Sequence, residues 1–142
     1  MYKTFPTFAV TNYRKFMMNI HSCLLCLGSN IDRETHLESA RMALAQAFPN
    51  IRFASEMETE AIGSRFLSPF SNQVATFTTT QDREQVRGIL KLIERGNGRL
   101  PEDKAQGVVK LDIDLLKFGD EVLKPADLAL PYVQAGLKEL GL

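Results

Sequence analysis

Apolar and polar residues alternate between residues 108 and 116, which predicts a half-buried β-strand. Asp112 and Asp114 would share one face of this strand, about 7 Å apart at a rise of roughly 3.3 Å per residue. Two carboxylates so placed suit magnesium, which commonly binds through one or two carboxylates plus substrate phosphates. A solvated polar face is the alternative explanation. The opposite face would carry an apolar row, namely Val109, Leu111, Ile113 and Leu115.

Two segments carry apolar residues three or four positions apart, as amphipathic helices do. The first covers residues 33–47 and is ended by Pro49 and Asn50. The second follows Asp82, a favourable N-cap, and ends at the glycine-rich residues 96–98. The apolar stripes are Leu37, Ala40, Leu44 and Phe48 in the first helix, and Val86, Ile89, Leu90 and Ile93 in the second.

Three further segments favour β-strands, at residues 22–27, 51–60 and 71–79. Residues 61–69 and the polar residues 99–107 are expected to be loops. The resulting order, βαββαβ, predicts an α+β, ferredoxin-like fold with an antiparallel sheet and two helices packed on one face.

Length and composition limit the function classes. A chain of 142 residues with 44% hydrophobic content predicts one ordinary domain, which we place at residues 19–142. The basic, acid-free residues 1–18 would be a loosely ordered extension, with a targeting peptide as the alternative. The formal net charge of zero argues against a nucleic-acid partner, and no apolar run is long enough to predict a membrane span.

Cys23 and Cys26 form a C-x-x-C sequence within an apolar run. Their odd spacing would place them on opposite faces of a strand, which disfavours a shared zinc or redox site. The chain has no second such pair, and its histidines are His21 and His36. We therefore interpret both cysteines as small buried hydrophobic residues, in a protein of the reducing cytoplasm.

A set of short segments occurs in a fixed order over about residues 22–132. The segments are Leu27-Gly28-Ser29-Asn30, Thr59-x-x-x-Gly63, Phe70-x-Asn72, Glu94, Gly98-Arg99, Leu111 to Gly119, and Leu130-Pro131. Each segment is weak alone, but their joint order and spacing are specific, and in this the sequence resembles the family of 6-hydroxymethyl-7,8-dihydropterin pyrophosphokinase (HPPK). The resemblance implies magnesium-dependent transfer of pyrophosphate from ATP to the pterin hydroxymethyl group in folate biosynthesis, leaving AMP.

The resemblance also implies the site residues. Asp112 and Asp114 would hold two magnesium ions and, with Arg99, form the catalytic set. ATP would contact Glu94, Arg99, Lys110 and Leu115. The pterin would contact Thr59, Ala61, Ile62, Gly63, Phe70 and Asn72. Without the family context, Phe70 and Asn72 could be a strand entry and turn, and Glu94 and Arg99 ordinary helix-end charges.

The match departs from the family where the triphosphate would bind. One lost charged contact to a phosphate typically costs about 2.7–4 kcal/mol of barrier lowering, so turnover is expected to be slow unless Lys104 or Lys110 substitutes. We expect Lys110 to share the face of the two aspartates. Val109, Pro101 and Asp127 stand at arginine positions of the family, Gln106 at a tryptophan position and Tyr132 at a histidine position.

The chain also ends at Leu142, before a segment that supplies an aromatic wall to the pterin pocket in the family. Two alternatives to the enzyme stay open. One is a module that binds pterin or nucleotide without catalysis, and the other is an interaction domain that uses exposed sheet surface. As an enzyme, the protein would bind only small molecules and would be a monomer or weak dimer.

Overall fold

The computed structural model describes residues 19–60 and 68–142. The expected extension, residues 1–18, and the expected pterin contacts Ala61, Ile62 and Gly63 lie outside the described residues. In chain order the elements are β1 (His21–Ser29), α2 (Arg33–Ala47), β2 (Arg52–Phe53), β3 (Met57–Thr59), β4 (Phe70–Thr79), α3 (Arg83–Gly96), the 3₁₀ helix η1 (Pro101–Gln106), β5 (Asp112–Phe118), β6 (Glu121–Val122), α4 (Pro125–Leu128) and α5 (Pro131–Glu139).

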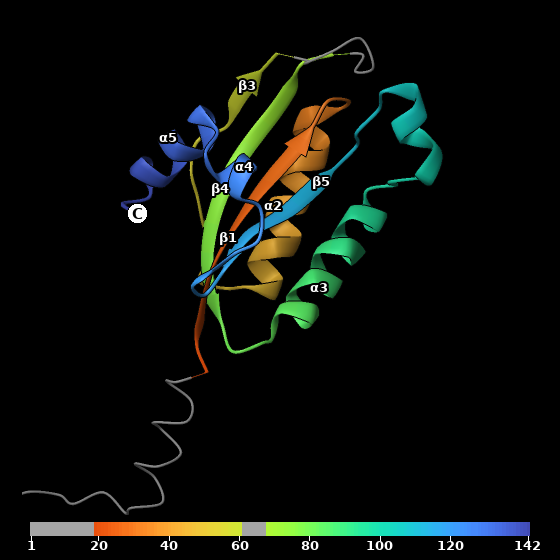
Figure 1. Cartoon of the computed structure of the whole chain (residues 1–142). Helices are drawn as coiled ribbons and strands as arrows, with labels where there is room; N and C mark the ends of the chain where they lie inside the picture. The colour runs from red at the N-terminus through yellow and green to blue at the C-terminus, as the bar shows by residue number, and fades with distance from the viewer. Residues whose placement is uncertain (1–18, 61–67) are drawn as a thin grey trace, which may run out of the picture.

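The strands form one antiparallel sheet in the order β2-β4-β1-β5-β6, and β3 also pairs with β4. The first strand of the chain, β1, therefore lies between β4 and β5 at the centre of the sheet (Figure 1). This strand order, with α2 and α3 as the two connecting helices, is the ferredoxin-like arrangement. The predicted fold class is confirmed.

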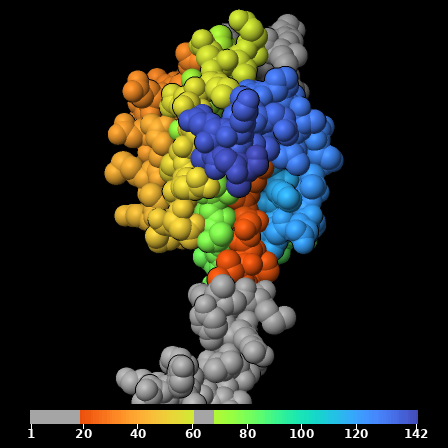
Figure 2. Space-filling model, turned by 90° about the vertical axis from the view of Figure 1, so that its left-hand side faces the viewer, coloured from red at the N-terminus to blue at the C-terminus, as the bar shows by residue number. Residues whose placement is uncertain are grey.

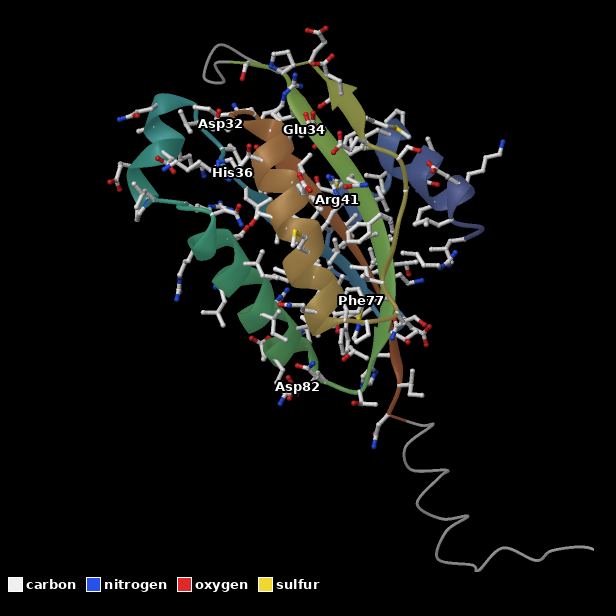
Figure 3. All side chains as sticks on the ribbon, turned by 180° about the vertical axis from the view of Figure 1, so that it is seen from behind. Asp32, Glu34, His36, Arg41, Phe77 and Asp82 are labelled. Atoms are coloured by element: carbon white, nitrogen blue, oxygen red, sulfur yellow. The ribbon has the colours of Figure 1, made fainter. Side chains whose placement is uncertain are left out.

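Helices α2 and α3 lie side by side in opposite directions over one face of the sheet (Figure 3). The predicted N-cap of α3 is confirmed, because the Asp82 carboxylate accepts a hydrogen bond from the backbone N–H of Gln85. The core on this face consists of Cys23, Leu25, Leu27, Leu37, Ala40, Leu44, Phe48, Ala75, Phe77, Val86, Leu90, Leu111, Ile113 and Leu115.

Helix α5 packs on the opposite face, an element that the sequence reasoning did not anticipate (Figures 1 and 2). Gly136 permits the close approach, since a Cβ atom there would lie 2.9 Å from Val74 Cβ. The second core consists of Leu24, Cys26, Ala54, Val74, Leu116, Val133 and Leu140.

The two cysteines are free, buried and on opposite faces of β1, as the sequence predicted. Burial raises the pKa of Cys23 to about 11 and that of Cys26 to about 12, so both stay protonated thiols at neutral pH. Within the described part of the chain, no helix is long and apolar enough to span a membrane.

Three expectations about element bounds were wrong. The strand expected at 51–60 is two short strands, β2 and β3, that pair with different parts of β4. The expected loop at 99–107 contains η1. The strand expected to begin at residue 108 begins at Asp112, because the Asn30 side chain bonds the backbone of Gly107 and Val109 in place of a strand partner.

Candidate active site

The two aspartates of β5 lie on the same face of the sheet, as the alternation predicted. The intervening Ile113 is buried in the core beneath α2 and α3, so the aspartates project toward the α5 side. Each carboxylate is about one third exposed, at 36% for Asp112 and 32% for Asp114. This acidic pair, Asp112 and Asp114, is the centre of the site.

A row across three strands connects the acidic pair to the expected pterin residues. Gly28 of β1 is paired with Asn72 of β4 on one side and with Asp112 of β5 on the other. Paired residues project to the same face, so Asn72 and Asp112 are separated by two strand spacings, roughly 10 Å. Gly28 lies between them without a side chain, and a Cβ atom there would be 3.2 Å from Asn72 Oδ1.

On the β4 side of this row, Asn72 is buried and already bonded. Its Nδ2 donates a hydrogen bond of 2.7 Å to Thr59 Oγ1 of β3. Phe70 lies at the first position of β4 and lines the cavity in front of the acidic pair. The structure thus brings together three of the expected pterin contacts, Thr59, Phe70 and Asn72.

Arg99 links the acidic pair to α3. Its Nη1 lies 2.9 Å from Asp112 Oδ1 and 2.6 Å from Glu94 Oε2, and it also donates to the Leu111 carbonyl. Glu94 Oε2 in turn accepts the Ile113 backbone N–H at 2.8 Å. Glu94 therefore satisfies a donor on the open edge of β5 and holds Arg99 against the acidic pair.

The two carboxyls of the acidic pair titrate differently. Burial, followed by the neighbouring Asp112 carboxyl, raises the pKa of Asp114 to about 7. Burial alone would also raise the pKa of Asp112, but hydrogen bonds from Asp114 and Arg99 hold it below its ordinary value. Near pH 7 the pair is therefore only partly ionised, because adjacent half-buried carboxylates repel each other.

Lys110 makes its contacts outside the acidic pair. It lies in the bend before β5, where its Nζ donates to the Gly98 carbonyl at 2.8 Å and lies 3.3 Å from Asp103 Oδ2. That it shares the face of the two aspartates stays a prediction.

A different lysine forms an ion pair with the acidic pair. Lys124, which directly precedes α4, has its Nζ 3.4 Å from Asp114 Oδ1. Sequence reasoning missed it, because it lies ten positions beyond the aspartate and is brought back only by the turn between β5 and β6.

In the described part of the chain, three cavities reach the acidic pair, and the smallest, about 80 Å³, lies over Gly28 and Asn72 and is bordered by Tyr132 and Val133 of α5. The main cavity, about 640 Å³, lies between η1, Phe70 and the acidic pair. The edge cavity, about 250 Å³, lies along the open edge of β5 and α3. Arg99 and Lys124 line both the main cavity and the edge cavity. Lys104 lines only the main cavity, and Glu94 and Leu115 line only the edge cavity.

The donor set of the acidic pair fits magnesium. Two neighbouring carboxylates that repel each other provide hard oxygen ligands for a divalent cation. Residues 19–60 and 68–142 contain no cluster of three or more His, Cys, Asp or Glu side chains placed to hold a metal. Two protein carboxylates match the usual magnesium site, in which phosphate and water oxygens complete the coordination.

A family model described as 7,8-dihydro-6-hydroxymethylpterin-pyrophosphokinase (HPPK) matches residues 24–140, most of the chain. The chain belongs to the HPPK family. That membership implies ATP-dependent pyrophosphokinase chemistry on hydroxymethyldihydropterin in folate synthesis. Among solved structures, the chain is similar to a de novo designed protein with a ferredoxin fold, LFR1 1, at 14% identity and a TM-score of 0.30, over 72% of this chain and 88% of that one.

Proposed function

We propose that this protein catalyses the magnesium-dependent transfer of pyrophosphate from ATP to 6-hydroxymethyl-7,8-dihydropterin, with slow turnover. The observation that carries the proposal is the row formed by Asn72, Gly28 and Asp112 across β4, β1 and β5. It aligns an amide suited to a flat heterocycle with a carboxylate suited to a metal–phosphate complex, on one face of three adjacent strands.

The pterin would bind at the β4 end of the row. The Asn72 amide offers both a donor and an acceptor to the ring edge, and its bond to Thr59 fixes its orientation. Phe70 would stack against the ring. We keep Ala61, Ile62 and Gly63 as proposed pterin contacts, by family resemblance.

The phosphates of ATP would bind at the acidic pair. Asp112 and Asp114 would hold two magnesium ions, which when bound would supply positive charge to the phosphate oxygens. Arg99, held by Glu94, would contact the same phosphates, and the edge cavity with Leu115 would accept the rest of the nucleotide. We propose no ATP contact for Lys110, whose ammonium group is occupied by Asp103 and a backbone carbonyl.

In the reaction the pterin hydroxyl loses its proton to solvent, and its oxygen forms a bond to the β-phosphorus of ATP. The bond between that phosphorus and the oxygen shared with the α-phosphorus breaks, and AMP leaves. Arg99 stabilises charge on the transferred group, and the Asn72 end of the site holds the hydroxyl in line. The arginine positions taken by Val109 and Pro101 supply no charge, which is the reason for slow turnover.

The decisive experiment incubates the protein with magnesium, ATP and the reduced hydroxymethylpterin and measures AMP. AMP formation that requires the pterin supports the proposal. No AMP above a protein-free background, at high protein concentration and long incubation, rejects it.

A binding module without catalysis is the second candidate, favoured by Val109, Pro101 and Asp127 at arginine positions. Calorimetric titration with the pterin and with a non-hydrolysable ATP analogue distinguishes the two. Binding without AMP formation supports the module, and an absence of binding to both ligands rejects it.

The remaining proposals concern the setting of the protein. We propose that residues 19–142 form a single domain preceded by an extension, and that the protein works as a monomer or weak dimer. The free cysteines support a reducing compartment, the cytoplasm.

A further inference from the structure

Two cationic side chains neutralise the acidic pair, and one of them is held by fewer contacts than the other. Arg99 bonds Asp112, but it is also tied to Glu94 and to the Leu111 carbonyl. Among the described residues, Lys124 has Asp114 as its one side-chain partner, at the loose distance of 3.4 Å. Its side chain is 49% exposed, so the pair is close to a surface ion pair and is easily exchanged.

The position of Lys124 suits a second task. Like Arg99, it lines the main cavity and the edge cavity, so its side chain borders the space where the phosphate chain would lie. A lysine carries its charge at the end of a flexible four-carbon stem, which can move between neighbouring anions without repacking the core. Lys104 lines only the main cavity of these two, and in the described part of the chain it forms no ion pair with either aspartate.

We infer that Lys124 is a phosphate-binding residue that exchanges partners, from Asp114 in the free protein to the ATP phosphates when a divalent cation occupies the acidic pair. This inference rests on the proposed function. A divalent cation on Asp114 repels the ammonium group, and the phosphates beside it attract that group. Lys124 thereby replaces charge that the chain lacks at Val109, Pro101 and Asp127.

The variant Lys124→Ala tests the exchange of partners, because it should change metal affinity and nucleotide affinity in opposite directions. Without the competing ammonium group, Mn²⁺ alone should bind the acidic pair severalfold more tightly, measured by water-proton relaxation without nucleotide. A non-hydrolysable ATP analogue with magnesium should bind about tenfold more weakly by calorimetry, the size expected for one lost charge-assisted hydrogen bond. Lys124→Arg should retain most of the analogue affinity.

Lys117→Ala is the matched control. Lys117 belongs to β5, the strand that carries the acidic pair, but it lines neither the main cavity nor the edge cavity. This variant should leave both affinities unchanged. Unchanged analogue affinity in Lys124→Ala overturns the inference, and so does a parallel loss of Mn²⁺ and analogue affinity, which would mean that Lys124 only shapes the site. Unchanged Mn²⁺ affinity overturns the exchange of partners.

The outcome can be separated from that of the proposed function. If the wild-type protein forms AMP but Lys124→Ala binds the analogue normally, only the inference fails. If the wild-type protein binds the analogue but forms no AMP, the proposed reaction fails, and the two affinities still decide the role of Lys124. A wild-type protein that does not bind the analogue overturns both.

Discussion

The two ends of the site differ in how their polar groups are satisfied before any ligand binds. At the β4 end, Asn72 and Thr59 are neutral partners joined by a 2.7 Å hydrogen bond. At the β5 end, two carboxylates lie together, and each forms an ion pair. Asp112 pairs with Arg99, and Asp114 pairs with Lys124. Gly28 is the only residue of β1 that separates Asn72 from Asp112 in the strand pairing.

This difference indicates two ways of preparing a site. The neutral end is preorganised, because a buried amide held by one hydrogen bond needs no rearrangement to bind a heterocycle. The charged end must change partners, because its cations occupy the carboxylates that a metal ion would need. Substitutions at the two ends should therefore separate pterin binding from metal and nucleotide binding.

The largest effect is expected from Asp112→Asn, which removes one charge of the acidic pair and one of the two ion pairs of Arg99. Loss of metal-assisted charge stabilisation should lower AMP formation by about 1,000-fold or more, measured as initial rates at saturating substrates. Pterin binding should persist, since we propose that the pterin binds at the other end. Asp120→Asn, an exposed position beyond β5, serves as the control. If Asp112→Asn were as active as this control, the acidic pair would be an ordinary polar strand face and not a metal site.

The opposite end is tested by Asn72→Ala. It removes the amide and leaves the Thr59 hydroxyl without this partner, so the pterin KM should rise about tenfold. The affinity for the ATP analogue should stay within about twofold, because Asn72 forms no hydrogen bond with the charged residues in the described part of the chain. Asn50→Ala at the far end of β4, where Asn50 bonds Thr78, controls for a general loss of stability. Equal losses for both ligands would show that the two ends are not separable.

Gly28→Ala tests the boundary between the two ends with a smaller effect. The new Cβ atom would lie 3.2 Å from Asn72 Oδ1 and 3.8 Å from Phe70 Cδ1, so the Asn72 amide must shift by a few tenths of an ångström. Pterin affinity should fall severalfold, about 0.5–1 kcal/mol. Analogue affinity should not change. A selective loss of analogue affinity would mean that the new Cβ atom crowds Asp112 and not Asn72.

Sequence reasoning named residues at both ends of the candidate site but did not predict how the two ends are joined in the sheet. The alternation around Ile113 correctly placed the acidic pair on one face, because local periodicity decides which side of a strand is buried. The row through Gly28 depends on strand register, which no single segment encodes. Only the ordered family resemblance pointed to Asn72 and Arg99 together.

The errors at the charged end have specific physical causes. The strand was expected to begin at residue 108, but Asn30 bonds the backbone groups of Gly107 and Val109, and β5 begins at Asp112. Lys124 was missed because the turn between β5 and β6 brings it back to Asp114. Helix α5 was missed because it buries only Val133 and Gly136, too few residues to form a clear stripe.

The smallest effect concerns the free energy of unfolding, and it measures the repulsion between the two carboxylates at the charged end. Because burial and Asp112 raise the pKa of Asp114 to about 7 in the folded protein, well above its unfolded value, the carboxyl contributes stability below pH 4 that is lost as the pH rises through 7. Asp114→Asn removes this loss. The metal-free variant should therefore gain stability over wild type as the pH rises from 5 to 8.5, by an amount on the order of 1 kcal/mol, reduced by solvent screening at a side chain one third exposed.

Urea unfolding in a chelating buffer at several pH values measures this gain, and Asp120→Asn again provides the control. Magnesium and the ATP analogue should reverse the order, because only wild type can use the second carboxylate to bind the metal and gain stability from it. If the variant and wild type lose stability in parallel as the pH rises, the two carboxylates do not repel each other. The charged end would then be as preorganised as the neutral one.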